Sequence, residues 1–386
     1  MIEIKDKHDC VGCRACEQIC PKQCISMLVD NEGFRYPVVD LTLCIDCHLC
    51  EKICPVLIDR KSSKPLKCLA CKSSDTNVQL ASSSGGVFSV LAAEIIQRGG
   101  VVFGALFDDK FKVIHSSTDS LDGIAPFRRS KYVQSDTCDA FSKVKSLLTA
   151  GREVLFCGTP CQVKGLKLFL RKEYENLWTV DFICHGVPSP KVWEDYLANL
   201  IEEQGAEWKL TDVNFRSKSL GGWHKFALQF DFEDSDGKSN VIARYPGQDP
   251  YYQLFFQNIS LRPSCYKCPA KGFSSGSDFT LGDFWGIQKF LPEFDDNKGV
   301  SLLMANTQKT IQLLGQLNIK SVEVDYDIAI RSNPSANHSV AEPKQRKAFF
   351  ADDNFTMNRL KKFSGLDFYG RVRRRIIELG LSILKR

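Results

Sequence analysis

Two cysteine runs near the start of the chain have a spacing that binds metal. Each run has the pattern Cys-x-x-Cys-x-x-Cys-x-x-x-Cys-Pro, and the eight cysteines are Cys10, Cys13, Cys16, Cys20, Cys44, Cys47, Cys50 and Cys54. This spacing is typical of 4Fe–4S ligands, and the fourth cysteine of one run binds the cluster of the other. Two residues separate each cysteine from the next, so one short loop can place three thiolates at three corners of the cube.

The two runs therefore predict two clusters, each with three thiolates from one run and one from the other. The first cluster has the ligands Cys10, Cys13, Cys16 and Cys54. The second has the ligands Cys44, Cys47, Cys50 and Cys20. The alternative is a pair of structural zinc sites, but zinc sites favour two separated Cys-x-x-Cys pairs over an evenly repeated run. The sequence thus predicts a double 4Fe–4S domain of the bacterial ferredoxin type.

A second group of four cysteines lies farther along the chain. Cys161 follows a predicted strand at a Gly-Thr-Pro turn, and Cys184 ends the next predicted strand. Because a strand–helix–strand crossover is usually parallel, both turns are expected at the carboxyl edge of a sheet, where ligands bind in open α/β folds. Cys265 and Cys268 form a further pair in a loop rich in Gly, Ser and Pro. Together these thiols predict a third 4Fe–4S cluster, with a zinc site or no metal as the alternatives.

The other five cysteines have no predicted ligand role. Cys24 and Cys138 are expected to be structural, and a buried cysteine behaves as a small hydrophobic residue. Cys68 and Cys71 form a Cys-x-x-Cys pair, but no second pair lies near them in the sequence. Cys157 is expected at the buried end of a strand, with a redox disulfide to the cysteine four residues later as the alternative.

The composition is that of an ordinary globular protein. The chain has 386 residues, of which 43% are hydrophobic and 25% are charged, and this length suits two or three domains. No apolar run approaches the roughly 20 residues of a transmembrane helix. The charged start is not expected to be a secretory signal, and clustered cysteines in a cytoplasmic chain indicate metal binding rather than disulfides.

The net charge of +5 is confined to the end of the chain. Residues 371–386 contain six basic residues and one acidic residue, so the rest of the chain is neutral overall. A neutral body argues against a nucleic-acid-binding protein. Apolar residues on one helical face follow a run of arginines, which predicts a basic terminal helix. Two placements are open for this helix: on an anionic membrane surface or a partner, or against the protein's own body.

The elements around the cysteines are expected to form three parts. Residues 1–58 form the ferredoxin-like domain, and a polar linker with a proline follows at 59–66. Residues 67–290 form a mixed α/β domain, and residues 291–386 form a C-terminal extension with the basic terminal helix. The predicted fold class is therefore mixed, α+β or α/β, with a ferredoxin-like domain first.

Within the second part, apolar periodicity predicts the elements that position the second group of cysteines. A helix is expected over 87–98, between a serine cap and a glycine stop. Strands are expected at 101–107 and 112–117 as a hairpin. Two further strands at 153–157 and 177–184 enclose the helix that begins at the Gly-Thr-Pro turn.

A phosphate-binding candidate also lies at a predicted helix start. The chain has no Gly-x-Gly-x-x-Gly and no Walker A sequence, but residues 82–86 have the sequence Ser-Ser-Ser-Gly-Gly. Backbone N–H groups at a helix N-terminus suit a pyrophosphate, with a simple helix cap as the alternative. A flavin would fit a protein with electron-carrying clusters, because it exchanges single electrons with clusters and hydride with substrates.

Six segments in this order resemble the coenzyme F420 hydrogenase/dehydrogenase β-subunit family. They are SSSGGVFS (82–89), SKYVQS (130–135), FCGTPCQVKGL (156–166), DFICHGVPSPKVW (181–193), LRPSCYKCP (261–269) and DFTLGDFWGI (278–287). The resemblance implies an FAD-containing iron–sulfur oxidoreductase that exchanges electrons with a deazaflavin or another acceptor. It implies FAD contacts at Ser84, Gly85, Gly86, Lys131, Tyr132, Thr159, Pro160 and Gln162. It also makes the cluster of Cys161, Cys184, Cys265 and Cys268 the one nearest the flavin.

The chain departs from this family in two ways. Cys157 stands where a plain apolar residue is expected. The double-cluster domain before residue 67 and the roughly 100 residues after 290 exceed a minimal β subunit, and they leave the identity of the electron acceptor open.

The expected function is that of a cytoplasmic, FAD-dependent iron–sulfur oxidoreductase. It would pass electrons between a redox partner protein, its clusters and FAD, with hydride exchange to a deazaflavin or other small-molecule acceptor. The competing hypothesis is an electron-transfer subunit of a larger redox complex with no substrate of its own.

Two further candidates concern substrate chemistry. His185 is a candidate proton donor, and a hydrogen-bonded structural histidine is the alternative. The segment containing Arg216, Trp223, His224 and Lys225 is a candidate binding loop for an acidic or sugar-like substrate, and a solvated loop is the alternative. Asp283 is expected to cap a turn.

Overall fold

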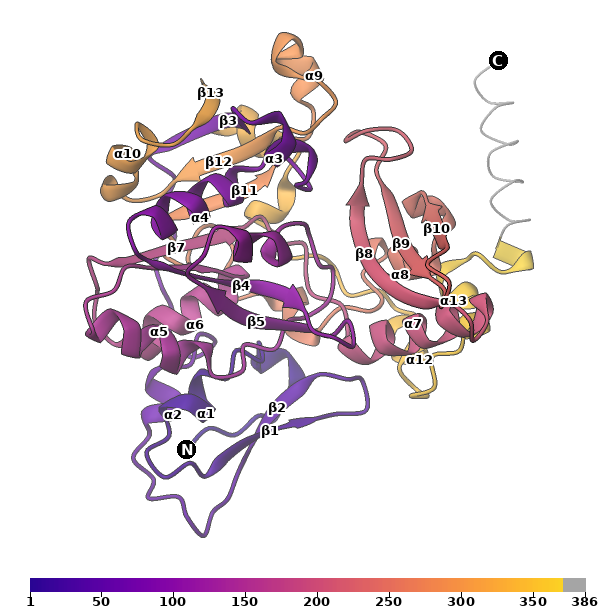
Figure 1. The fold of residues 1–386 in the computed structure, drawn as a ribbon. Helices are drawn as coiled ribbons and strands as arrows, with labels where there is room; N and C mark the ends of the chain where they lie inside the picture. The colour runs from indigo at the N-terminus through magenta and orange to yellow at the C-terminus, as the bar shows by residue number, and fades with distance from the viewer. Residues whose placement is uncertain (371–386) are drawn as a thin grey trace.

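The computed structural model describes residues 1–370, and Figure 1 shows them as a central sheet with two flanking regions. The N-terminal cysteine-rich region lies at one end of the molecule, and a smaller sheet with its own helices lies beside the central sheet. The predicted basic terminal helix at 371–386 lies outside the described residues. Within residues 1–370, no helix is both long and apolar enough to span a bilayer.

The N-terminal region contains two short helices and a hairpin. Its elements are η1 (Lys7–Asp9), α1 (Ala15–Ile19), the antiparallel strands β1 (Ile25–Val29) and β2 (Arg35–Val39), and α2 (Leu49–Lys52). Arg14 and His48, which precede the two helices, both have left-handed backbone, with φ of 57° and 58°. Gly12 and Asp46, two positions earlier, are also left-handed, with φ of 70° and 51°. The sequence repeat is therefore also a repeat of backbone conformation, and it curves each loop around its three cysteines.

The central sheet has eight strands in the order β13-β3-β12-β11-β7-β6-β4-β5. In that order the strands are Ile319–Val324, Lys67–Ser73, Ser301–Ala305, Phe279–Asp283, Leu177–Phe182, Val154–Cys157, Val101–Phe107 and Val113–Thr118. β11, β7, β6 and β4 are parallel neighbours, and the pairs toward both edges are antiparallel. Parallel strands are covered on both faces and are therefore almost continuously apolar. Val154, Leu155 and Phe156 of β6 are fully buried in agreement with this position.

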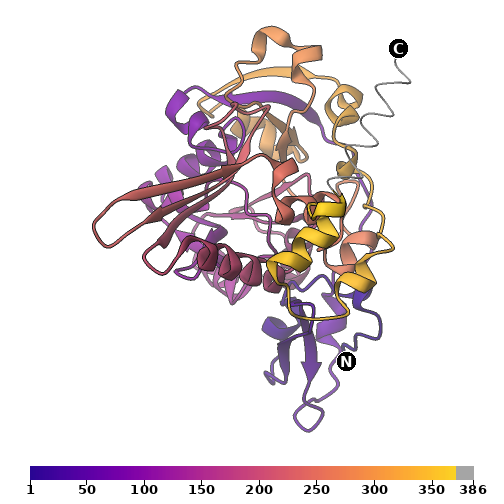
Figure 2. The ribbon, with the colours of Figure 1, turned by 90° about the vertical axis from the view of Figure 1, so that its right-hand side faces the viewer.

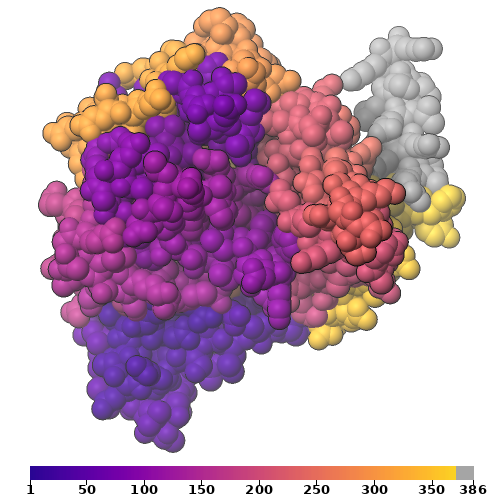
Figure 3. Space-filling view, viewed as in Figure 1, coloured from indigo at the N-terminus to yellow at the C-terminus, as the bar shows by residue number. Residues whose placement is uncertain are grey.

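Helices cover both faces of the central sheet. α4 (Val87–Gln97) and α10 (Gln308–Leu314) pack on one face, and α5 (Ala140–Thr149) and α6 (Pro160–Leu170) pack on the other. Apolar residues of the N-terminal region join the core formed with α5 and α6. In Figure 3 the N-terminal residues lie directly against this side of the central region. The helix that follows the Gly-Thr-Pro turn thus separates the sheet from the cysteine-rich region.

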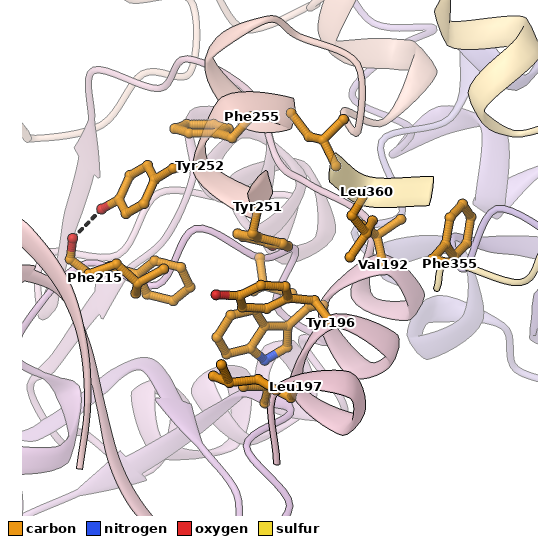
Figure 4. Packing of buried hydrophobic residues seen from close by; sticks show 14 of the residues in the cluster. Val192, Tyr196, Leu197, Phe215, Tyr251, Tyr252, Phe255, Phe355 and Leu360 are labelled. Atoms are coloured by element: carbon orange, nitrogen blue, oxygen red, sulfur yellow. Dashed lines mark hydrogen bonds between the residues drawn. The ribbon is translucent and has the colours of Figure 1, made fainter. Parts of the chain in front are cut away.

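The smaller sheet is antiparallel and has the order β10-β9-β8. Its strands are β8 (Lys209–Ser217), β9 (Ala227–Glu233) and β10 (Ser239–Arg244), and its helices are α7 (Pro190–Gln204), α8 (Pro250–Phe256), α12 (Arg346–Phe349) and α13 (Met357–Ser364). Figure 2 shows the long hairpin of this sheet and the helices beside it. Strands and helices meet in an aromatic core, in which the Tyr252 hydroxyl donates a hydrogen bond to the Phe215 carbonyl (Figure 4).

The remaining elements are short helices in the connections between the strands and the longer helices. They are α3 (Thr76–Leu80), η2 (Asp122–Phe127), η3 (Pro246–Gln248), η4 (Pro263–Lys267), α9 (Ile287–Phe290), η5 (Pro292–Phe294), α11 (Tyr326–Arg331) and η6 (Pro334–Ala336).

The predicted mixed α/β fold is confirmed. The helix expected over 87–98 is α4, the expected hairpin is β4 and β5, and the strands around the Gly-Thr-Pro turn are β6 and β7. β7 ends two residues earlier than expected, so Cys184 lies in the loop after it. β12 and β13 come after residue 290, so the expected boundary at 290 falls between neighbouring strands of one sheet.

Candidate functional site

The predicted site residues lie where the parallel strands end. β6, β7 and β11 are adjacent and parallel, so their carboxyl ends share one edge of the sheet. Cys161 lies just after β6, Cys184 lies just after β7, and Asp283 is the last residue of β11. The two turns are therefore side by side, as the crossover argument predicts.

Pairing between two loops brings the other pair of cysteines to this edge. Pro188 and Leu261 form an antiparallel bridge between the loop after β7 and the loop before η4. Gly186 permits the close approach, because its φ is +149° and a Cβ there would lie 2.8 Å from the Leu261 side chain. Cys265 follows in η4, and its Sγ accepts a hydrogen bond from the Val187 N–H at 3.4 Å.

We call Cys161, Cys184, Cys265 and Cys268 the third thiol set. Burial raises the pKa of Cys161, Cys184 and Cys265 to about 12, and a negative charge on Cys268 adds to the rise for each of them. The four thiols thus form one electrostatic group in which free thiolates are disfavoured. Binding of a metal cluster removes this penalty, because the ligands bind in their deprotonated form. A donor set of four sulfurs suits a 4Fe–4S cluster.

Three of the predicted flavin contacts share a helix turn with Cys161. Pro160 is the first residue of α6, where its fixed φ suits the helix. The Thr159 N–H donates to Gln162 Oε1 at 2.9 Å, and Gln162 Nε2 donates to Ser135 Oγ at 3.0 Å. Thr159 Oγ1 lies 3.2 Å from the sulfur of Cys161. A ligand held by this turn would therefore lie next to the third thiol set.

The Ser-Ser-Ser-Gly-Gly turn lies at the same edge. Ser84 precedes Gly85, whose N–H donates to Ser301 Oγ at 2.9 Å. A Cβ at Gly85 would lie 2.4 Å from the Cys71 carbonyl oxygen, so only glycine fits between β3 and β12. Gly86 has φ of +83° and is the cap of α4. The first backbone N–H groups of an α-helix have no partner within the helix, and this geometry suits a phosphate.

Lys131 and Tyr132 lie in a segment that crosses the edge between these two turns. The Ser130 N–H donates to Ser83 Oγ at 2.8 Å, which attaches the segment to the serine turn. Lys131 Nζ donates to backbone carbonyls of the preceding loop, and burial lowers its pKa to about 7. The Tyr132 ring stacks on Phe255 with 4.8 Å between centroids. The segment thus connects the serine turn with the turn of Gln162, so all eight predicted flavin contacts lie along one edge of the sheet.

The eight N-terminal cysteines lie close together, and the sequence analysis assigns them to two groups. We call Cys10, Cys13, Cys16 and Cys54 the first thiol set, and Cys20, Cys44, Cys47 and Cys50 the second. Burial raises the pKa of Cys13 and Cys16, and the other cysteines of the first set add to the rise, with a further contribution from Cys50 of the second set to Cys16. All four cysteines of the second set line one small cavity of about 20 Å³, together with Cys24. The sulfurs of Cys20 and Cys24 lie 3.4 Å apart.

The sulfur chemistry of the chain is that of free thiols. All 17 cysteines lie within residues 1–370 and none forms a disulfide, including Cys157 and Cys161. Within the same residues, no three His, Cys, Asp or Glu side chains converge on a point that would hold a single metal ion. The four thiolates of a 4Fe–4S cluster bind four different iron atoms, so they surround the cluster instead of converging on one ion.

His185 follows Cys184, and its side chain contacts Asn258 and Phe255. Its Nε2 lies 2.7 Å from Asn258 Oδ1, and its ring packs edge-to-face on Phe255 with 5.1 Å between centroids. Burial lowers its pKa. These contacts describe a hydrogen-bonded neutral imidazole.

The predicted substrate loop is anchored by Asp283. One carboxylate oxygen accepts from Arg216 Nη1 at 2.7 Å, and the other accepts from Trp223 Nε1 at 3.0 Å. Arg216 is buried, and its guanidinium carbon lies 3.9 Å from the centroid of Phe226. Asp283 therefore holds two buried side chains of the loop, a role that its expected function as a turn cap misses.

The end of that loop borders an open hollow. His224 and Lys225 line it with Phe226, Tyr245 and Pro246, and its volume is about 310 Å³. His224 Nε2 lies 2.6 Å from an oxygen of Asp295. Of the four predicted loop residues, the structure thus buries Arg216 and Trp223 and leaves His224 and Lys225 at a surface hollow.

Two buried cations that the sequence analysis did not single out lie between the first and third thiol sets. Lys164 of α6 donates to the Pro269 carbonyl at 2.9 Å. Arg262 Nε donates to the Cys10 carbonyl at 2.7 Å. The available signal was position, because each cation lies three residues from a cysteine of the third set, Cys161 or Cys265.

Comparisons with known proteins identify similar families for two parts of the chain. Residues 9–58 match the family model of a 4Fe-4S dicluster domain, which defines the chain as an iron–sulfur protein. Residues 151–325 match the model for the C terminus of the coenzyme F420 hydrogenase/dehydrogenase beta subunit. These residues are similar to that β subunit, and they follow the dicluster domain in the chain. Both family models describe redox proteins, which supports an oxidoreductase or electron-transfer role.

The chain is also similar to a solved structure. A chain of the xenon-derivatized F420-reducing [NiFe] hydrogenase complex from Methanosarcina barkeri is 15% identical, and the match covers 69% of this chain and 84% of that one with a TM-score of 0.43. No curated protein matches the chain.

Proposed function

We propose that the chain is an FAD-dependent iron–sulfur oxidoreductase with three 4Fe–4S clusters. The first and second thiol sets would each hold a cluster in the N-terminal region, and the third set would hold one at the sheet edge. Clusters supply one-electron transfer, and FAD supplies the coupling to hydride chemistry. The two-electron partner would be a deazaflavin or another small-molecule acceptor.

The observation that carries this proposal is the shared turn at the start of α6. Thr159 Oγ1 lies 3.2 Å from Cys161 Sγ, while the Thr159 N–H and side chain are fixed by Gln162. The turn thus joins predicted flavin contacts to a predicted cluster ligand without an intervening element. The serine turn and Lys131 supply the hydrogen-bond donors and positive charge that an FAD pyrophosphate requires.

A second candidate function is an electron-transfer subunit without a substrate of its own. The family model that matches residues 151–325 is described as that of a beta subunit, which favours a partner complex. Purified chain that reduces a deazaflavin or a dye unaided supports the enzyme. Activity that appears only with a partner supports the subunit. For either function we propose the cytoplasm, where thiols stay reduced.

The decisive variant is Cys184→Ser, because Cys184 belongs only to the third thiol set. Anaerobically purified chain is expected to contain about twelve iron atoms, since each 4Fe–4S cluster holds four. Cys184→Ser is expected to lose about four of them and to retain FAD that a reduced ferredoxin no longer reduces. Cys138→Ser is the matched control, because Cys138 belongs to no thiol set. Unchanged iron and normal flavin reduction in Cys184→Ser would refute the third cluster.

A further inference from the structure

One face of α6 connects the first thiol set to the third. Cys161 lies in the first turn of this helix, and Lys164 and Gly165 follow at three and four positions, so all three lie on the same face. A Cβ at Gly165 would lie 3.0 Å from the sulfur of Cys13. The helix therefore contributes a ligand to the third set and presses its bare backbone against a ligand of the first.

Lys164 is buried between the two sets. The residue is 1% exposed, and its Nζ donates to the carbonyl of Pro269, the neighbour of Cys268. Its charge interacts with Cys268 of the third set and with Cys54 of the first. Two other charged groups act on Lys164. The negative charge of Asp59 stabilises the ammonium, and the positive charge of Arg60 repels it. Burial of an ammonium is costly unless negative charge lies nearby, and cluster thiolates on both sides would provide it.

We propose that Lys164 is a shared electrostatic residue that raises the reduction potentials of the clusters held by the first and third thiol sets. This inference rests on the proposed function, because it requires a cluster in the third set. A cluster gains one negative charge when it is reduced, so a fixed cation nearby stabilises the reduced form more than the oxidised form. Because Lys164 acts on both sets, the reduction potentials of both clusters would rise together. The difference between these potentials, which drives electron transfer between the two clusters, would therefore change little.

Arg262 contributes to the same boundary but is a poorer probe. Its guanidinium donates to the carbonyls of Cys10 and Arg35 and to the side chain of Gln134. Replacing Arg262 would leave several buried carbonyls without a donor and would disturb the packing of the N-terminal region. Among residues 1–370, Lys164 has one acceptor, the neutral Pro269 carbonyl, so its charge can be removed while this hydrogen bond is kept.

The test compares Lys164→Gln, which keeps a donor without the charge, with Lys164→Arg, which keeps the charge. Redox titration of the full chain, followed by electron paramagnetic resonance, measures each cluster separately. Lys164→Gln is expected to shift the potentials of the first and third sets to more negative values and to leave the second set unchanged. Lys164→Arg is expected to behave like the wild type. Lys143→Gln is the control, since Lys143 is exposed on α5 and pairs with exposed Asp139.

A second variant tests the same charge from the surface. Asp59 is exposed, and its negative charge partly cancels that of Lys164. Asp59→Asn is therefore expected to shift the same two reduction potentials in the positive direction without affecting the fold. Unchanged potentials in both Lys164→Gln and Asp59→Asn, or equal shifts of all three clusters, would overturn the inference. About eight iron atoms in the wild-type chain would instead refute the third cluster of the proposed function.

Discussion

Arg346 and Glu32 form a buried ion pair although 314 residues separate them in the chain. Two guanidinium nitrogens donate to the two carboxylate oxygens, at 3.2 and 2.5 Å. Glu32 lies in the turn of the N-terminal hairpin, and Arg346 begins α12 beside the smaller sheet. The cysteine-rich region is therefore locked to a part of the chain that is synthesised much later.

Glu32→Gln is expected to destabilise the whole chain. The substitution leaves the Arg346 guanidinium buried without its counter-charge, and breaking a buried pair in this way costs about 3–5 kcal/mol. Denaturant unfolding of the anaerobically purified protein measures the loss. Glu3→Gln is the control, because Glu3 is exposed and pairs with exposed Lys5. Equal stability of the two variants would show that the Arg346 pair contributes little.

We also expect residues 1–58 to stay bound to the rest of the protein after the chain is cleaved in the linker at 59–66. The sequence suggests a linker at 59–66, but the contacts of Arg262 and Arg346 with the N-terminal region do not pass through it. A protease site inserted at residues 61–64 should yield two fragments that elute together in size-exclusion chromatography. Separation of the fragments would show that residues 1–58 are an independent domain.

Loss of Cys47 should affect the second cluster alone. Cys47 is the exposed member of the second thiol set, and the other three cysteines still line the cavity after its removal. Cys47→Ala is expected to lower the occupancy of this cluster or to leave a three-iron form, which electron paramagnetic resonance detects. FAD content should stay at the wild-type value, because the predicted flavin contacts lie at the sheet edge and outside the N-terminal region. Parallel loss of FAD and iron would contradict the separation of the sites.

FAD binding should depend on pH through Lys131. Burial lowers the pKa of Lys131 to about 7 in the folded chain. FAD affinity, measured by fluorescence titration, is expected to fall as the pH rises through 7, because the neutral amine no longer attracts the pyrophosphate. Lys131→Met should bind FAD more weakly and with little dependence on pH between about 6 and 8. Exposed Lys143 on α5 provides the control variant Lys143→Met.

The same lysine gives a stability prediction of known sign for the FAD-free chain. The pKa of a lysine in an unfolded chain is about 10.4, whereas burial lowers the pKa of Lys131 to about 7 in the folded chain. Between these values the unfolded state binds more protons, so stability rises with pH across this window. Thermal unfolding of the FAD-free chain at pH 7 and pH 9 measures the rise, which Lys131→Met should reduce. An equal rise in wild type and variant would assign it to other groups.

Local patterns were enough to predict the fold around the parallel strands. The apolar run of β6, its Gly-Thr-Pro turn and the following helix predicted that Cys161 and Cys184 would share one edge. Non-local pairings were beyond such patterns. The bridge between Pro188 and Leu261, which brings Cys265 to that edge, joins two loops with no periodic signal. The short run of β12 gave no indication that its partners would be β3 and β11.

Charge was the other missed feature. A lysine in a helix is usually solvated, so nothing in the sequence marked Lys164 as buried. Its position became meaningful only when the fold placed the N-terminal region against α6. The role of Asp283 as the acceptor for Arg216 and Trp223 was missed for the same reason. Arg216 belongs to β8 of the smaller sheet, and Trp223 lies in the loop after β8.

The strand order of the central sheet also has a consequence for biosynthesis. Within residues 1–370, β3 pairs only with β12 and β13, which follow it by more than 200 residues. During translation the first two thiol sets leave the ribosome long before these strands, while β3 waits without a partner and exposes both of its edges. Such unpaired edges invite aggregation. We therefore expect iron–sulfur assembly on residues 1–58 to precede closure of the sheet, and chains truncated before residue 301 to accumulate as insoluble protein.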